Sequence, residues 1–428
     1  MKYSIQNVQV INHDESFIGN ILVGGGKILK VSKSPTSKQK DTRKRDYLIS
    51  PSKGEVSVKE IDGTGKLLMP GIIDPHVHFR DPGLTDKEDF TSGSKAAICG
   101  GVTSVFDMPN TVPPTFTVEA LKQKRAIVQS KSLVNWGLYF GGGDNIDEIK
   151  KVKNIPGVKL YVNSTTGNLK NIDKDIWRQI FHATQKVSLH AEGEAFAEVV
   201  KVWKEEKYPC ELHLCHTSLK LEINLLRSLK KDTLTSSLIS AEVCPHYLLL
   251  TSEDLARYPL ATMKPPLATK EDQGALWEGI QDGTIDILAT DHAPHLISEK
   301  EKLPPSYGIP GVETLFPLMF TEFVKRGISL SKFVEMTSWR TREIFHIQNS
   351  KGYIFDGFDA DMILVDPHKK WKIDSNIFYS KAHWSPFEDW NVEGQIEKVW
   401  LGGELICEEG RISNKETRGK EIFFESAG

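Results

Sequence analysis

Residues 71–86 have the sequence GIIDPHVHFRDPGLTD, in which an apolar run ends in two histidines one residue apart. The run has the length and the β-branched content of a buried strand. Alternate side chains of a strand point to the same side, so we expect His76 and His78 to face one way, about 6.6 to 7 Å apart. Two neutral imidazoles placed in this way can hold one zinc-class ion, although an HxH pattern alone is weak evidence.

The rest of the middle of the chain continues the pattern of this strand. Between Leu67 and about Ile347, short apolar runs alternate with amphipathic helical stretches. Strands separated by helices pair in parallel through right-handed crossovers, and eight of them can close into a barrel. We therefore predict an α/β fold with a (β/α)8 TIM-type barrel over residues 67–350. The eight expected strands are IIDPHVH, TSVFDMP, NWGLYFG, VKLYV, KVSLHA, ELHLCH, SAEVCPH and IDILATDHAPH.

The two ends of the chain have a different pattern. Residues 17–32, FIGNILVGGGKILKVS, alternate apolar and polar positions around a glycine turn, and residues 361–366 and 396–412 repeat that alternation. This pattern predicts antiparallel hairpins. We expect the two ends to share a sheet and predict a small β-sandwich domain from residues 1–66 and 351–428, the second part including a C-terminal tail.

Composition narrows the classes of partner. The chain has 428 residues, 54 basic and 57 acidic side chains and a formal net charge of −3, which gives no global field favouring nucleic acid or an anionic membrane. The five cysteines show no CxxC spacing, which suits reduced thiols. No stretch approaches the roughly 20 apolar residues of a membrane span, and no cleavable signal precedes the first strand. We predict a cytoplasmic protein with a small-molecule substrate.

Further candidate metal ligands stand where other predicted strands end. His190 ends the fifth strand, His216 the sixth and Asp291 the eighth. Barrel enzymes build their active sites at the C-terminal ends of their strands. A single histidine at such a position is more often a hydrogen-bonded core residue than a metal ligand. Ligand-type side chains at the same end of four strands favour a metal site.

Lys159 ends the fourth predicted strand, in KLYVNSTTGN. A lysine that points into a barrel is unfavourable when charged unless it is paired, so burial favours the neutral amine. A neutral amine can add carbon dioxide to become a carbamate, whose two oxygens can bridge two metal ions. The alternative is an inward lysine that reaches a carboxylate.

The motifs as a set resemble those of the dihydroorotases of the amidohydrolase superfamily. The resemblance runs in order through PGIIDPHVHFRDPGLTDKEDF, GGVTSVFDMPNT, KLYVNSTTGN, LHAE, CHTS, EVCPHYL and ATDHAPH, and covers most of residues 61–367. It implies one or two zinc ions per subunit and, as in many relatives, a homo-oligomer. The implied ligands are His76, His78 and Asp291 for one ion and His190 and His216 for the other, with carboxylated Lys159 joining them.

The resemblance also implies a reaction, the reversible cyclisation of N-carbamoyl-L-aspartate to L-dihydroorotate in pyrimidine biosynthesis. A hydroxide bridging the ions would attack the ring carbonyl, and Asp291 would be the catalytic acid and base that relays the proton to the amide nitrogen.

Four residues are candidates for substrate binding. Arg80 can grip a carboxylate with two parallel hydrogen bonds, and Asn110 and His295 match the family's other carboxylate contacts. Lys264 stands where many relatives have an asparagine, and either contacts the substrate or is a surface lysine. The role of His246 stays open.

Three other functions compete with this interpretation. Dihydropyrimidinases and hydantoinases share the metals but act on rings without the carboxylate, and Arg80 and Asn110 argue against them. Allantoinases share part of the loop, but LTDKEDF at residues 84–90 fits the dihydroorotases better. A non-catalytic scaffold paralogue would typically lose ligands, whereas all six positions are filled here.

Overall fold

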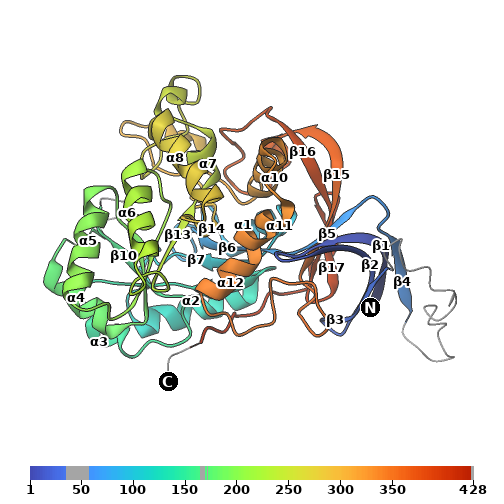
Figure 1. Cartoon of the computed structure of the whole chain (residues 1–428), viewed down its shortest axis with the longest axis horizontal. Coiled ribbons are helices and arrows are strands. Elements are labelled where there is room, and N and C mark those ends of the chain that lie inside the picture. Colours follow the sequence, from blue (N-terminus) through green and yellow to red (C-terminus); the bar gives the residue numbers. More distant parts are fainter. Residues whose placement is uncertain (35–56, 164–168, 171, 426–428) are drawn as a thin grey trace.

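The computed structural model describes residues 1–34, 57–163, 169–170 and 172–425. Figure 1 shows helices packed around parallel strands in one half of the molecule and a mainly antiparallel sheet, which holds the N-terminus, in the other. In the part of the chain that the structure describes, no helix combines the length and apolar character that a membrane span requires.

The parallel strands follow the predicted runs, which confirms the α/β alternation. One sheet has the order β6-β7-β8 and the other the order β14-β13-β12-β11-β10-β9. The strands are β6 Ile72–Val77, β7 Val102–Asp107, β8 Asn135–Leu138, β9 Phe140–Gly141, β10 Val158–Tyr161, β11 Lys186–His190, β12 Glu211–Leu214, β13 Ile239–Val243 and β14 Ile287–Leu288.

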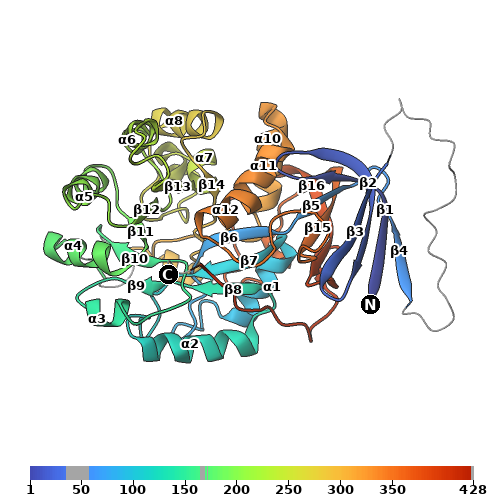
Figure 2. The same cartoon turned by 60° about the horizontal axis from the view of Figure 1, so that its bottom comes forward.

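The two parallel sheets adjoin at both edges. Only Tyr139 separates β8 from β9 along the chain. At the other edge Val77 forms a parallel bridge with His292, and the backbone N–H of His78 donates to the carbonyl of His292 at 2.8 Å. Figure 2 shows these strands side by side.

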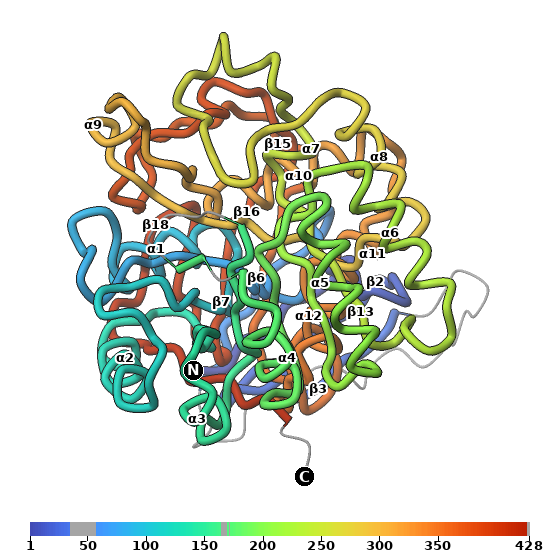
Figure 3. The backbone as a smooth tube through the Cα atoms, turned by 90° about the vertical axis from the view of Figure 1, so that its left-hand side faces the viewer, coloured from blue at the N-terminus to red at the C-terminus, as the bar shows by residue number. Residues whose placement is uncertain are grey.

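Helices lie around the outside of these strands (Figure 3). In α4 the apolar side chains of Trp177, Ile180 and Phe181 recur at helical spacing and are buried, which ties this helix to the core. The helices are α1 Phe90–Cys99, α2 Val118–Lys131, α3 Ile146–Ile149, α4 Lys174–Ala183, α5 Glu194–Glu205, α6 Lys220–Lys231, α7 Pro245–Leu249, α8 Lys270–Gln281, α9 Ile297–Lys300, α10 Leu315–Arg326, α11 Leu330–Val334 and α12 Arg340–Ile344.

The two ends of the chain share one sheet, as the sequence predicts. β5 pairs with β1 from the N-terminal end and with β15 from the C-terminal end. The order of this nine-stranded sheet is β18-β17-β16-β15-β5-β1-β2-β3, with β4 paired to β1. The strands are β1 Lys2–Ile11, β2 Ser16–Gly24, β3 Lys27–Lys33, β4 Val58–Asp62, β5 Leu67–Pro70, β15 Met362–Lys372, β16 Asn391–Leu401, β17 Glu404–Glu408 and β18 Arg411–Ile412.

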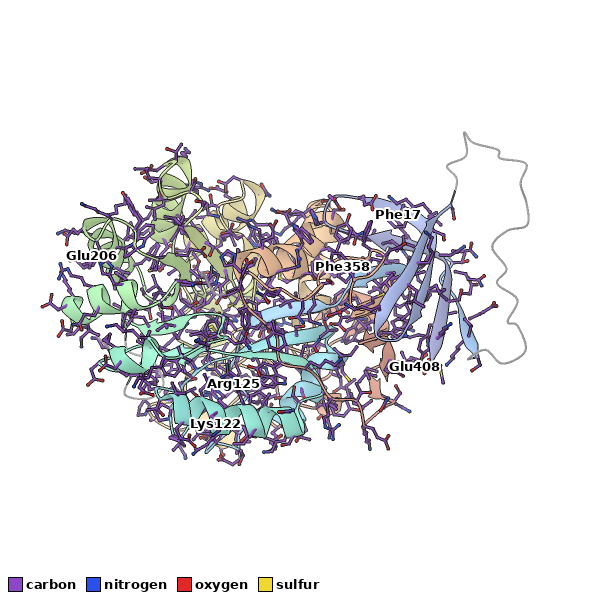
Figure 4. The ribbon with its side chains drawn as sticks, turned by 90° about the horizontal axis from the view of Figure 1, so that it is seen from below. Phe17, Lys122, Arg125, Glu206, Phe358 and Glu408 are labelled. Atoms are coloured by element: carbon purple, nitrogen blue, oxygen red, sulfur yellow. The ribbon has the colours of Figure 1, made fainter. Side chains whose placement is uncertain are left out.

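This sheet curves around its own core. The rings of Tyr3 on β1 and Trp400 on β16 lie 6.0 Å apart, although β5 and β15 lie between β1 and β16 in the sheet. Phe17 and Phe358, labelled in Figure 4, pack against the same core. The structure has one continuous sheet, and a sandwich of two sheets stays a prediction. β5 lies in this sheet although the predicted barrel domain begins at residue 67, and the predicted domain limits likewise stay a prediction.

The C-terminal tail returns to the parallel strands. Ile422 donates its backbone N–H to the carbonyl of Trp136 on β8 at 2.8 Å. Arg125 on α2, labelled in Figure 4, donates to Glu421 at 2.8 Å. Phe424 packs its ring against Phe106, with the ring centroids 5.2 Å apart. The last described residues therefore belong to the core around β7 and β8.

Candidate functional site

One pocket at the C-terminal ends of the parallel strands holds the six predicted metal ligands. Arg80, Asn110 and Lys264, three of the four predicted substrate contacts, line the same pocket, whereas His295 is not among its lining residues. The predicted ligands in its wall are His76, His78, Lys159, His190, His216 and Asp291. Each of the six is buried.

His76, His78 and Asp291 form a compact group of donors. The Nε2 atoms of His76 and His78 lie 3.2 Å and 3.1 Å from Oδ1 of Asp291. One ligand atom from each of the three lies within 4.8 Å of the other two. Burial raises the pKa of Asp291, but His76 and His78 lower it well below its usual value. Two imidazoles and an ionised carboxylate around one point fit a divalent cation of the zinc class.

Glu242 on β13 orients His76, a role that the sequence interpretation missed. Its carboxylate accepts the Nδ1–H of His76, and it lies 3.1 Å from Nε2 of His213 and 3.0 Å from the backbone N–H of His216. Because Nδ1 of His76 is used in this way, Nε2 is the nitrogen that faces Asp291 and the one that a cation would bind, in exchange for its proton. Burial alone would lower the pKa of His76, but Glu242 and Asp291 raise it to about 10.

Glu242 also belongs to a second group of potential ligands, with His76 and Cys215. Since its oxygens already accept N–H groups from three residues, we assign Glu242 to orienting the ligands rather than to binding a metal. The available signal in the sequence was an acidic residue inside the buried run SAEVCPH, a position where a carboxylate requires several donors.

Of the other three predicted ligands, His190 ends β11 and His216 follows β12 by two residues. Lys159 is the second residue of β10 and does not end that strand as predicted. Nδ1 of His190 and Nε2 of His216 are 2.9 Å apart. Burial lowers the pKa of both imidazoles, and for His216 the proximity of His190 and Lys159 lowers it further. Neutral imidazole is the form that binds metals.

Buried atoms without partners mark the space between these residues. Among the described residues, Nζ of Lys159 and Nδ1 of His216 have no hydrogen-bond partner. The Lys159 side chain is fully buried, and its Nζ lies 5.6 Å from the centroid of the Tyr161 ring. Buried polar atoms normally have partners, so these atoms fit a site that is completed by a bound group.

Arg80 is held in a strained backbone conformation at the edge of the donor group. Its φ is 63°, in the left-handed region, and it is buried. Its Nε donates to the carbonyl of Pro294 at 3.3 Å and its Nη2 to Nε2 of His295 at 3.2 Å. His295 therefore lies behind Arg80. Burial and Arg80 lower the pKa of His295 to about 2, so this imidazole is neutral and accepts from the guanidinium.

Asn110 and Lys264 complete the wall beside Arg80. Oδ1 of Asn110 accepts the Nδ1–H of His78 at 2.7 Å and so orients that imidazole. Lys264 has its Nζ 4.5 Å from the centroid of the Tyr307 ring, and both side chains line the pocket. His246 is buried, and burial lowers its pKa to about 4. The sequence did not predict Tyr307 as a pocket residue, because Tyr307 belongs to none of the motifs and its position depends on how its loop folds.

Comparison with known proteins now identifies the family. The amidohydrolase family matches residues 67–406. The chain belongs to the amidohydrolase family. This amidohydrolase is 33% identical to the dihydroorotase of Methanosarcina acetivorans, over 99% of this chain and 95% of that one. It is 36% identical to the dihydroorotase of Pyrococcus horikoshii, over 90% of this chain and 91% of that one.

A solved structure gives the corresponding result for the fold. The L-hydantoinase (dihydropyrimidinase) of Arthrobacter aurescens superposes with a TM-score of 0.87 at 25% identity, over 98% of this chain and 99% of that one. The match extends over both halves of the molecule. The family and the relatives confirm the predicted resemblance and the hydrolase class of this enzyme.

Proposed function

We propose that this amidohydrolase is a dihydroorotase, which interconverts N-carbamoyl-L-aspartate and L-dihydroorotate in pyrimidine biosynthesis by making and breaking a cyclic amide C–N bond. The observation that carries the proposal is the buried guanidinium of Arg80 in the wall of the pocket that holds the ligand-type group. Both molecules have a carboxylate that does not react, and a guanidinium fork binds a carboxylate with two parallel hydrogen bonds. The two relatives named above are dihydroorotases, and this chain aligns with nearly the whole length of each.

The donor set fits one or two zinc ions. His76, His78 and Asp291 would hold one ion, and His190 and His216 a second, with Lys159 as a carbamate between them. The partnerless Nζ of Lys159 and Nδ1 of His216, among the described residues, support this assignment. Bound zinc would supply Lewis acidity at the ring carbonyl and a water molecule of lowered pKa.

Substrate binding, proton transfer and orientation of the ligands would depend on side chains of this protein. Arg80 binds the substrate carboxylate, and the amide group of Asn110 donates to it from the side opposite His78. Asp291 takes a proton on its carboxylate and passes it to the amide nitrogen that leaves when the ring opens. In the reverse direction the same carboxylate removes that proton as the ring closes. Glu242 keeps His76 in the orientation that the site needs. His295 supports Arg80, and Lys264 is placed to meet the anionic substrate at the pocket rim.

We further infer that the eight parallel strands close into one (β/α)8 barrel. The passage from β8 through Tyr139 into β9 and the bridge between Val77 and His292 support closure, since they connect the two sheets at both edges. A closed barrel brings all the strand ends to one rim, which accounts for ligands drawn from so many strands.

A dihydropyrimidinase or hydantoinase activity is the second candidate. The likeness to the Arthrobacter aurescens L-hydantoinase over 98% of the chain favours it. Its substrates have no carboxylate for Arg80 to bind. In that case Arg80 would be a buried charge in the pocket wall without a ligand to pair with, which is unfavourable.

An assay of the purified protein tests the proposal directly. Dihydroorotate, dihydrouracil and allantoin are offered side by side, and zinc content is measured on the same sample. We expect hydrolysis of dihydroorotate, cyclisation of carbamoyl-aspartate, and one or two zinc ions per chain. Turnover of dihydrouracil or allantoin without turnover of dihydroorotate would overturn the proposal.

A further inference from the structure

Lys300, the last residue of α9, has an environment that the proposed reaction leaves unexplained. It is 3% exposed. Its Nζ lies within hydrogen-bond distance of four oxygens, which its three N–H groups share: the carbonyl and the hydroxyl of Thr262 at 2.7 Å and 2.9 Å, the carbonyl of Ser306 at 2.7 Å and that of Gly308 at 2.9 Å. All four acceptors are neutral oxygens. A buried ammonium without a carboxylate is unfavourable unless its hydrogen bonds are well made, so this side chain needs a reason to be there.

The four acceptors belong to two segments that are far apart in the sequence, and both carry side chains of the pocket. Thr262 precedes Lys264 by two residues, and Ser306 and Gly308 flank Tyr307. Lys264 and Tyr307 both line the pocket, and their contact across it has an Nζ-to-centroid distance of 4.5 Å. Lys300 therefore binds the backbone on both sides of Tyr307 and the chain two residues before Lys264.

The segment around Tyr307 is also fixed from the side of the strands. Gly308 has a φ of 134°, and a Cβ atom at this position would lie 2.5 Å from the carbonyl oxygen of Ala293. Its backbone N–H donates to the carbonyl of Thr262 at 3.0 Å. Ala293 lines the pocket as well. The loop is thus packed closely against the segment that follows Asp291, and Lys300 donates to its carbonyls at Ser306 and Gly308.

Burial lowers the pKa of Lys300 to about 7. The four oxygen acceptors around its Nζ favour the ammonium form, whose N–H groups suit this position better than an apolar side chain of similar volume. An ammonium has three N–H donors and can serve acceptors from both segments at once. Hydrogen bonds from a charged donor are stronger than neutral ones. The ring of Trp384, 5.6 Å from Nζ, stabilises the cation from another side. A methionine would fill the space and leave buried carbonyl oxygens without donors.

We propose that Lys300 is a positioning residue of the substrate pocket: it clamps the Thr262 and Ser306–Gly308 segments together and thereby fixes Lys264 and Tyr307 over the pocket. We call Thr262, Lys300, Ser306 and Gly308 the rim clamp. The inference rests on the proposed function, in which the substrate is an anion that Lys264 meets at the rim. Lys300 acts through Lys264 and does not itself touch the substrate.

A double-mutant cycle on the full-length, metal-loaded protein tests the rim clamp. We expect Lys300→Met and Lys264→Met each to raise KM by roughly tenfold, since each removes an interaction of a charged group, and to change kcat by less than about threefold. If Lys300 acts through Lys264, the double variant should have a KM within about twofold of the worse single variant. A merely structural role would give multiplied effects instead.

The matched control is Lys186→Met. Lys186 is also a buried lysine, paired with Glu211, but it lies at the N-terminal end of β11, opposite the end that carries His190. This variant should keep the wild-type KM even where its thermal stability falls. Zinc content and the melting temperature are measured for every variant. If Lys300→Met fails to fold, Thr262→Val, which removes the hydroxyl acceptor alone, takes its place in the cycle with a smaller effect in the same direction.

Two results would overturn the rim clamp: a wild-type KM in the folded Lys300 or Thr262 variant, or effects that multiply in the double variant. The cycle is measured on the cyclic amide that the wild-type enzyme hydrolyses best. Failure of the wild-type enzyme on dihydroorotate would overturn the proposed function, whereas the KM pattern alone decides on the clamp.

Discussion

At the scale of single residues, the amine of Lys159 is a buried group of the pocket with no hydrogen-bond partner in the part of the chain that the structure describes. Lys159→Ala should abolish turnover and lower the zinc content, because no oxygen donor would remain between the two groups of histidines. A short carboxylic acid such as acetate should restore part of the activity, since its two oxygens can replace the carbamate. Two tightly held zinc ions in this variant would contradict the carbamate assignment.

The carboxylate of Glu242 sets the orientation of a ligand. Glu242→Gln should weaken zinc binding by roughly 10- to 100-fold, as is typical when the partner of a ligating histidine is lost. The amide cannot accept N–H groups on both of its atoms, so either His76 or His213 loses its acceptor. Competition with a chelator measures the affinity. Glu211→Gln is the control. Glu211 is the first residue of β12, at the end of the strands away from the ligands, so this variant should bind zinc as the wild type does.

Strand ends made the histidine and aspartate ligands predictable from sequence, because a ligand-type residue that follows an apolar run lies where the strand meets its loop. Lys159 is an exception, since it is the second residue of β10 and not its end. Glu242 was missed because a buried carboxylate that accepts N–H groups does not differ in sequence from other acidic residues inside strands. The place of His295 behind Arg80 depends on side-chain rotamers and on Pro294, which only the folded chain brings together.

At the scale of elements, the packing of α1 against the segment after β6 supports the site. A Cβ atom on Gly93 in α1 would lie 2.7 Å from the ring of Phe79, which stands between His78 and Arg80 in the sequence. Gly93→Ala should therefore destabilise the protein by about 1 to 2 kcal/mol, since overpacking outweighs the gain of about 1 kcal/mol in helix propensity. Urea unfolding measures the change.

Gly274 in α8 is the matched control for Gly93. A Cβ atom there would meet nothing within 4 Å. Gly274→Ala should therefore stabilise the protein by about 0.5 to 1 kcal/mol, because only the helix propensity changes. Equal effects at the two glycines would show that Phe79 is not packed as described.

The sequence predicted the order of strands and helices well, since each strand is a short apolar run between amphipathic helices. It did not predict the break between β8 and β9 at Tyr139, nor the curvature that turns the end segments into one continuous nine-stranded sheet. Curvature depends on contacts such as that between Tyr3 and Trp400, which join distant parts of the chain.

At the scale of the whole molecule, the C-terminal tail completes the core around β7 and β8. Phe424 is 8% exposed and its neighbour Phe423 is 55% exposed. Phe424→Ala should lower the free energy of unfolding by about 3 to 5 kcal/mol, as for other buried phenylalanines. Phe423→Ala should change it by less than about 0.5 kcal/mol. Equal losses would place the tail elsewhere. No periodicity in the sequence marked this segment as part of the core.

Zinc identity, a homo-oligomeric assembly and a cytoplasmic location stay predictions. They concern partners and surroundings, which the fold of one chain does not determine. The substrate is different, because the chain itself supplies the groups that would recognise it.

The proposed function depends most on the claim that Arg80 binds the substrate carboxylate beside the proposed metal ligands. Its test is the ratio of kcat/KM for dihydroorotate to that for dihydrouracil, the same ring without the carboxylate, in the wild type and in Arg80→Ala. A desolvated ion pair contributes about 2 to 5 kcal/mol, so the ratio should strongly favour dihydroorotate in the wild type and fall by roughly 30-fold or more in the variant. A ratio that Arg80→Ala leaves unchanged would contradict it.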